Sequence, residues 1–244
     1  MKRGREIVQE RRVFERKFER VFRRALIEQA LAVLKWDNFE GYETRVSLAV
    51  RKEPIERAMI ELYQGTGAYF AAKTKVILTK ADSDVWLEQM ARYVRTKVAE
   101  RITFITETTA DQLKEMIRAA LGEVTLDGGG ISVSASAIQD ALAKDFGEMV
   151  RWRALRIAQT ETMTASNYAS KEGAESLGIE MTKSWMVSGV NTRDSHYAAQ
   201  ADNQNIPMDQ PFRVAGINCE YPGDPALPAG EVINCGCYVV YDPV

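Results

Sequence analysis

Hydrophobic residues recur every three or four positions through most of the first half of the chain, with charged residues between them. This spacing is typical of amphipathic helices. It is clearest in residues 5–36, where one apolar stripe contains Phe14, Phe18, Val21, Phe22, Ala25, Leu26, Ala30 and Val33. Similar patterns predict further helices over residues 53–74, 82–102, 108–121, 136–146 and 148–178.

A glycine-rich stretch, residues 122–134, separates these helical patterns into two groups. Consecutive glycines disfavour regular structure because they lose much backbone entropy on ordering. We therefore predict a helical region over residues 1–127 and a second domain over residues 128–244.

The chain changes character after about residue 183, where six of its seven prolines lie. Prolines at this density exclude long helices, and residues 183–190 and 237–241 have the composition of short strands. The predicted fold class is α+β: a helical N-terminal half followed by a small α+β domain with short antiparallel strands.

Composition limits the class of protein. The chain has 244 residues, 45% of them hydrophobic, and no apolar run long enough to span a bilayer. No apolar segment follows the basic N-terminus as in a signal peptide, so we expect synthesis and folding in a cytoplasm. Charge is uneven: residues 1–24 hold ten basic and four acidic residues, net +6, whereas residues 190–244 hold two basic and seven acidic residues, net −5. The two ends are therefore expected to meet different partners.

The candidate chemistry gathers near the C-terminus, which holds the chain's one histidine, His196, and its three cysteines, Cys219, Cys235 and Cys237. Four such ligands match the number that structural zinc requires, but the single residue between Cys235 and Cys237 is shorter than the usual zinc spacing. That spacing favours a second interpretation, in which the cysteines pack as small buried hydrophobes. A disulfide from Cys219 to Cys235 or Cys237 is a third interpretation, which a reducing cytoplasm opposes.

A catalytic thiol is a fourth interpretation of these residues. Asp194, Asp224, Asn218 and Asn234 are available to orient a Cys–His pair. The whole hypothesis depends on one histidine, and such a set occurs by chance in many chains. We therefore predict no catalytic residues and no enzyme activity.

The order of motifs in the second half resembles the phage Mu F-like head morphogenesis (minor head protein) family. The segments that carry the resemblance are "RALRIAQTETMTASN", "KSWMV", "RDSH", "YPGDP" and "INCGC". Gln159 and Gly236 stand where that family commonly has arginine. The residues that match its motifs are Thr160, Glu161, Trp185, Arg193, His196, Pro222, Gly223, Asp224, Asn234, Cys235 and Cys237.

The resemblance implies a minor head protein of a tailed double-stranded DNA phage or prophage, located inside the virion head. Expected partners are the portal protein, the major capsid or scaffold protein and double-stranded DNA, with roles in head assembly and DNA delivery and no membrane contact. No cofactor is required, and structural zinc stays a hypothesis. Glu161 has two interpretations: a buried acid that pairs with His196 or Arg193 from the later turn, and a structural brace between helix and turn, which is favoured.

The first predicted helix offers two kinds of contact. Phe14, Phe18 and Phe22 form a stripe that would dock on the portal. The basic side chains would neutralise DNA phosphates; these are Arg11, Arg12, Arg16, Lys17, Arg20, Arg23 and Arg24. Interleaved glutamates repel phosphate, so portal docking is favoured and a nucleic-acid-binding accessory protein is the alternative function.

Overall fold

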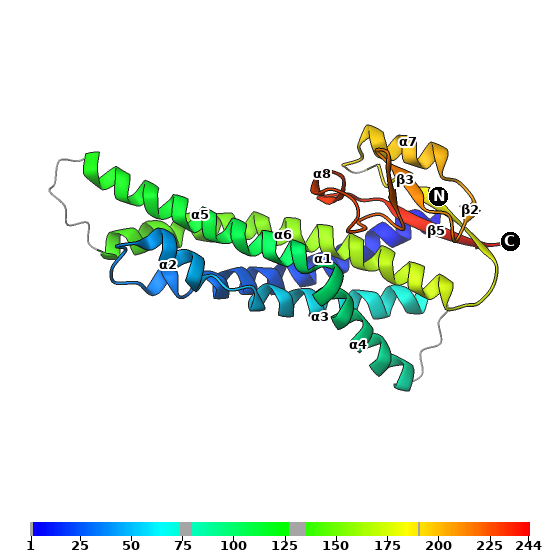
Figure 1. The fold of residues 1–244 in the computed structure, drawn as a ribbon, viewed down its shortest axis with the longest axis horizontal. Helices are drawn as coiled ribbons and strands as arrows, with labels where there is room; N and C mark the ends of the chain where they lie inside the picture. Colours follow the sequence, from blue (N-terminus) through cyan, green and yellow to red (C-terminus); the bar gives the residue numbers. More distant parts are fainter. Residues whose placement is uncertain (1, 74–79, 127–134, 190) are drawn as a thin grey trace. The chain divides into compact units, whose positions relative to one another are not determined.

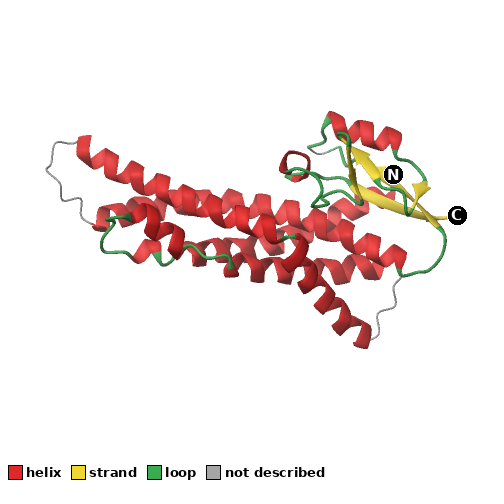
Figure 2. Ribbon diagram, in the orientation of Figure 1, coloured by secondary structure: helices red, strands yellow, loops and turns green. Residues whose placement is uncertain are grey.

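The helices and strands follow one another as Figures 1 and 2 show. The computed structural model describes all residues except 1, 74–79, 127–134 and 190. The N-terminal part has helices α1 (Lys2–Ala30), α2 (Tyr42–Ala49), α3 (Glu53–Lys73), α4 (Lys80–Lys97) and α5 (Ala99–Leu126), with a 3₁₀ turn over Val33–Lys35. The rest comprises α6 (Ala135–Glu175), β1 (Met181–Met186), α7 (Asp194–Asp202), β2 (Ile206–Pro207), β3 (Phe212–Val214), β4 (Ile217–Cys219), α8 (Ala229–Val232) and β5 (Tyr238–Pro243).

The predicted fold class is confirmed. Helices α5 and α6 are longer than predicted, whereas α1, α3 and α4 are slightly shorter. A single helix, α6, covers the two helices predicted over residues 136–178. Thr109 lies inside α5, where its hydroxyl donates to the Ile105 carbonyl, one turn back in the same helix. The three consecutive glycines of the glycine-rich stretch lie outside the described residues.

The chain divides into two compact units that do not follow the predicted boundary at residue 127. Unit 1 comprises Met1–Phe18, Met59–Lys97 and Arg156–Val244, and unit 2 comprises Glu19–Ala58 and Val98–Leu155. The units are discontinuous in sequence because α1, α3 and α6 each contribute residues to both.

Unit 2 is helical, and the polar side chains that it buries include Arg153 and Gln29, each with hydrogen-bond partners. Arg153 of α6 donates to the Ile105 carbonyl, Thr109 Oγ1 and Gln112 Oε1 of α5 at 2.6–3.2 Å. Burial lowers the pKa of Arg153 to about 10. Gln29 likewise donates to the Arg51 carbonyl and to Thr106 Oγ1.

The C-terminal half of α6 forms the centre of unit 1. Its residues 161–167 are all buried although five of the seven are polar, and a helix covered on every side belongs to a core. Thr164 and Ser166 donate to carbonyls of the preceding turn. Tyr63 of α3 donates to Glu161 at 2.8 Å, and the ring of Tyr168 stacks on Tyr93 of α4.

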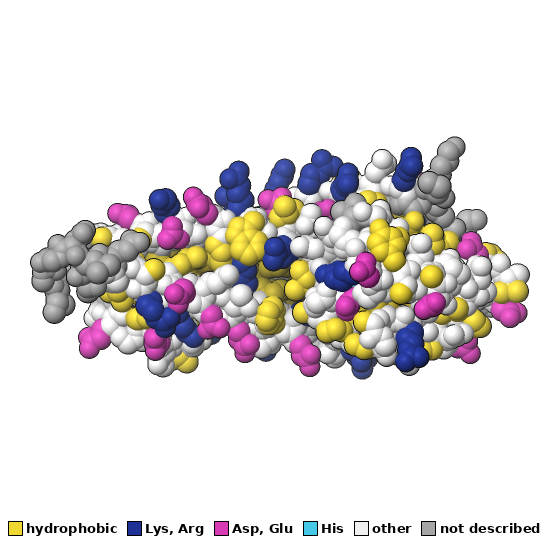
Figure 3. All heavy atoms as spheres, turned by 90° about the horizontal axis from the view of Figure 1, so that it is seen from above, with side chains coloured by type: hydrophobic (Ala, Val, Ile, Leu, Met, Phe, Trp, Pro, Cys, Tyr) yellow, Lys and Arg dark blue, Asp and Glu magenta, His cyan; other side chains and the backbone are white. Residues whose placement is uncertain are grey.

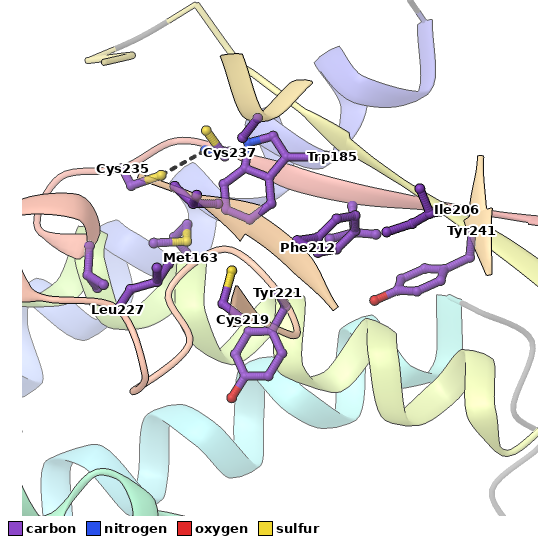
Figure 4. Close-up of a cluster of buried hydrophobic side chains, with 14 of the residues drawn as sticks. Met163, Trp185, Ile206, Phe212, Cys219, Tyr221, Leu227, Cys235, Cys237 and Tyr241 are labelled. Carbon is purple, nitrogen blue, oxygen red and sulfur yellow. Dashed lines mark hydrogen bonds between the residues drawn. The ribbon is translucent and has the colours of Figure 1, made fainter. Parts of the chain in front are cut away.

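Short antiparallel strands complete unit 1. One sheet has the order β2–β1–β5, with Trp185 opposite Val239 and Lys183 opposite Tyr241. The other sheet is the hairpin β3–β4, in which Phe212 faces Cys219. Figure 4 shows Trp185, Phe212 and Cys219 in one hydrophobic cluster together with Met163 of α6.

Charged and hydrophobic side chains both reach the surface of the molecule. On the face drawn in Figure 3, basic and acidic side chains are interspersed with hydrophobic ones and no histidine is visible, consistent with the complete burial of His196. Among the described residues, no helix has both the length and the apolar character that crossing a bilayer requires.

The predicted portal-docking stripe requires correction. Phe18 and Phe22 are 0% exposed, and Phe14 is half-buried with its ring against Tyr69 and Phe70 of α3. The stripe is apolar because it packs inside the fold, so these three side chains do not form a docking surface.

This correction predicts unequal effects of two matched substitutions. Phe18→Ala removes a fully buried ring and should lower the free energy of unfolding by about 3–5 kcal/mol. Phe104→Ala, at a ring that is 60% exposed, should change it by less than about 0.5 kcal/mol. Urea unfolding followed by circular dichroism measures both, and equal effects would contradict the assignment of Phe18 to the core.

Candidate metal centre

His196 is fully buried inside the C-terminal segment. It lies in the first turn of α7, after Arg193, whose extended backbone precedes the helix. Its imidazole meets the edge of Trp185 from β1, with ring centroids 5.8 Å apart. Strand β1 and helix α7 therefore fix the position of the ring.

Cys235 and Cys237 approach the same ring from the segment between α8 and β5. Asn234 has a φ of 58°, in the left-handed region that asparagine tolerates, and it turns the chain after α8. The Nδ1 atom of His196 lies 3.5 Å from Cys235 Sγ and 3.4 Å from Cys237 Sγ. The three donor atoms all lie within 4.8 Å of one another, so this buried group could hold a metal ion.

A carboxylate stands behind the imidazole. Glu231 Oε2 lies 2.9 Å from His196 Nε2, although the N–H bond is not aimed squarely at the oxygen. Ser195 donates to the same carboxylate oxygen at 2.8 Å. The carboxylate favours the tautomer with its proton on Nε2, which leaves the Nδ1 lone pair facing the two sulfurs.

The two thiols differ in acidity because they share hydrogen bonds. The pKa of Cys235 is lowered, chiefly because Cys237 donates to its sulfur, with a further contribution from His196. The pKa of Cys237 is raised because its thiol donates a hydrogen bond to Cys235 Sγ and because the Cys237 side chain is buried. The Cys237 amide also donates to Cys235 Sγ, as the dashed line in Figure 4 shows.

The backbone of the cysteine pair is held by side chains from two helices. Arg11 of α1 donates to the Cys237 carbonyl at 2.9 Å, and Asn167 of α6 donates to the same oxygen at 3.1 Å. Asn167 also donates to the Pro222 carbonyl. The helices thus fix the peptide that carries the second sulfur.

The segments that carry the sequence signature meet at this centre. Thr160 of α6 accepts the amide of Asn234 at 3.1 Å, and Arg193 donates to the Ile233 carbonyl at 2.8 Å. The turn at Pro222–Asp224 closes on α6, because Gly223 packs directly against Thr164. Asp224 fixes this turn by accepting the amides of Glu220 and Ala226.

Cys219, the fourth ligand of the zinc hypothesis, is not part of the group. It lies in β4, opposite Phe212, and burial raises its pKa. All three cysteines are free thiols in the structure. Cys219 packs as a buried hydrophobe, which is the second interpretation of the sequence, whereas the other two cysteines face the imidazole.

The predicted pairing of Glu161 with His196 or Arg193 is wrong. Glu161 accepts a hydrogen bond from Tyr63, whereas His196 contacts Glu231 and Arg193 contacts Ile233. Glu161 braces α6 against α3 because Tyr63 reaches it from that neighbouring helix. The predicted brace between a helix and a turn is therefore a brace between two helices.

The burial of the cysteine pair and of His196 argues against the catalytic interpretation. Cys235, His196 and Glu231 follow the order of a nucleophile, a base and an orienting acid. Cys235 is only 5% exposed, however, and Cys237 and His196 are fully buried. The sulfurs and the imidazole lie in the interior of unit 1, where an enclosed ion fits better than a reacting molecule.

Sequence reasoning missed Arg11, Glu231 and Asn167 as parts of the centre. The predicted DNA contact of Arg11 is wrong, because Arg11 is 4% exposed and donates its hydrogen bonds inside unit 1. Its position carried a usable signal: Arg11 precedes Phe14 and Phe18 by three and seven residues, so it lies on the apolar stripe. The other six basic residues of that group are exposed.

Comparison with known proteins gives one weak similarity. No family model matches the chain, and no solved structure matches it. The uncharacterized protein YqbB of Bacillus subtilis (strain 168) is 28% identical over 184 residues, which cover 68% of this chain and 59% of YqbB. The chain thus spans about three fifths of the length of this relative.

The turn at Gly223 yields a matched pair of substitutions. Gly223 and Gly216 have φ values of 89° and 81°, so alanine at either position is strained by about 1–2 kcal/mol. At Gly223 the added carbon would also overlap Thr164 Oγ1, whereas at Gly216 it meets open space. Gly223→Ala should therefore lower the free energy of unfolding by about 1–3 kcal/mol more than Gly216→Ala.

Denaturant unfolding of the two variants measures this difference. A Gly216→Ala variant as unstable as Gly223→Ala would show that the turn does not press on α6.

Proposed function

We propose that the protein is a minor head protein of a tailed double-stranded DNA phage or prophage, a structural component that associates with the portal inside the head. The observation that supports it is the meeting of the separate signature segments at one buried centre. Residues of four different signature segments contact one another. Thr160 accepts the amide of Asn234, and His196 faces Cys237. Gly223 packs against Thr164, and Asn167 donates to the Cys237 carbonyl. Chance matches to the motifs would have no reason to share one interior site.

We propose zinc as the ion of the candidate metal centre, with a structural role. Thiolates and imidazole together suit zinc. Ordinary zinc–nitrogen and zinc–sulfur bonds at tetrahedral angles would separate the two donor atoms by about 3.5 Å, which agrees with the observed 3.5 and 3.4 Å. The group supplies three protein ligands, so a fourth ligand would have to be a water molecule.

Zinc content tests this part of the proposal with a matched cysteine control. The full-length protein purified under reducing conditions with added zinc and then desalted should contain equimolar zinc by mass spectrometry of metals. Cys219→Ser should keep that zinc, because Cys219 lies outside the group. Cys237→Ser should lose most of it. Equal zinc in the two variants, or none in the unsubstituted protein, would contradict the proposed site.

The contact with the portal needs a surface other than the phenylalanine stripe. The exposed side of α1 carries Val13, which is 59% exposed, and the exposed basic residues Arg12, Arg16 and Arg20. We propose that this side of the helix contacts an acidic surface of the portal or of the capsid or scaffold protein. The same residues favour the second candidate function, binding of double-stranded DNA.

Co-purification tests the two candidates together. The protein co-expressed with the portal of its own phage should be retained with that portal after nuclease treatment. Arg16→Glu combined with Arg20→Glu should reduce retention at least tenfold because it reverses two exposed charges, whereas Glu107→Lys on α5 should not. Absence from portal and from mature particles would contradict the head assignment. Retention that nuclease abolishes and moderate salt weakens would instead support DNA binding.

A further inference from the structure

We infer that Arg11 is a positioning residue of the metal centre, and that metal binding in turn holds the N-terminal part of α1 on the C-terminal segment. The inference rests on the ion proposed above. It assigns to the centre a task beyond local stability, because it links the two ends of the chain.

The contacts of Arg11 join three separate parts of unit 1. Its Nε donates to Ser166 Oγ at 2.6 Å and its Nη2 donates to Asn167 Oδ1 at 2.7 Å, both on α6. Its Nη1 donates to the Cys237 carbonyl at 2.9 Å and reaches the Gly236 carbonyl at 3.4 Å. One side chain from α1 therefore binds both α6 and the cysteine pair.

The position of these carbonyls explains why an arginine is needed. Two cysteines with one residue between them place both sulfurs on one metal only if the peptide between them keeps a particular conformation. Arg11 Nη1 binds the carbonyls of Gly236 and Cys237, the middle residue and the second cysteine of that short segment. The planar, multiply donating guanidinium can do this while it also binds Ser166 and Asn167, which a lysine ammonium cannot.

The charges of the site indicate what Arg11 compensates. Its four acceptors are neutral, and in the described part of the chain it forms no ion pair with a carboxylate. Burial lowers its pKa to about 10, and the charges of Cys235 and Cys237 oppose that shift. The guanidinium therefore places a positive charge beside the two sulfurs, which would bind a metal ion as thiolates.

The coupling between Arg11 docking and metal binding is reciprocal, because both belong to one thermodynamic cycle. If Arg11 strengthens metal binding by a given factor, the metal strengthens the docking of Arg11 by the same factor. A residue that supports a metal ligand from outside the coordination sphere contributes about 10–100-fold to metal affinity. Removing the metal should therefore loosen α1 around residue 11, far from the ligands in sequence.

Two substitutions on neighbouring residues test the inference in the full-length protein. Arg11→Met keeps much of the side-chain volume but removes the donors, and it should weaken zinc affinity about 10–100-fold in competition with a chromophoric chelator. Arg12→Met changes an exposed residue of the same helix and should leave the affinity unchanged. Arg11→Lys, which keeps the charge, should fall between them, and it takes the place of Arg11→Met if that variant does not fold.

Hydrogen exchange supplies the reciprocal measurement. Amides of residues 8–16 should exchange more slowly with zinc than after chelation in the unsubstituted protein, and this difference should shrink in the Arg11 variant. Unchanged affinity in the Arg11 variants, or exchange in residues 8–16 that does not respond to zinc, would overturn the inference. Neither result depends on the portal, so the head assignment fails or holds separately.

Discussion

Two sulfurs separated by a single residue can meet one imidazole only when the intervening peptide is held in place, and much of unit 1 serves that constraint. Cys235 and Cys237 face Nδ1 of His196 at nearly equal distances. Arg11 and Asn167 fix the Cys237 carbonyl, while Glu231 stands against the other imidazole nitrogen. The ligands come from the C-terminal segment, but α1 and α6, which precede that segment in the sequence, hold the cysteine pair in place.

The buried polar run of α6 has its explanation in the same arrangement. Serine, threonine and asparagine are unusual in a helix core, where an unpaired polar group is costly. Here Thr160 and Asn167 bind backbone groups of the C-terminal segment, and Ser166 binds Arg11. A wholly apolar helix at this position would pack, but it could not hold the turns that carry the cysteines.

The sequence predicted most of the helices and the two longest strands because periodicity and composition are local signals. The amphipathic stripe of α1 and the β-branched run of β5 are examples. It did not predict that α1, α3 and α6 would each contribute to two units, because that depends on long-range packing. The helix predicted over residues 108–121 is only part of α5, which runs from Ala99 to Leu126.

The candidate site was predicted in part for the same physical reason. Residue type indicates His196, Cys235 and Cys237 as ligands. It equally indicates Cys219, which the β3–β4 hairpin places elsewhere. Arg11 was grouped with the surface arginines because charge alone does not reveal burial. The contact between Glu231 and His196 spans 35 positions along the chain, and no local sequence pattern indicates it.

X-ray absorption at the zinc edge of the metal-loaded protein tests the account most directly, because it counts the sulfur ligands. We expect two sulfur atoms at about 2.3 Å from the zinc and two nitrogen or oxygen atoms at about 2.0–2.1 Å. A spectrum with three sulfurs would place Cys219 on the metal, and one without sulfur would remove the ion from the cysteine pair. Either result would contradict the centre described here.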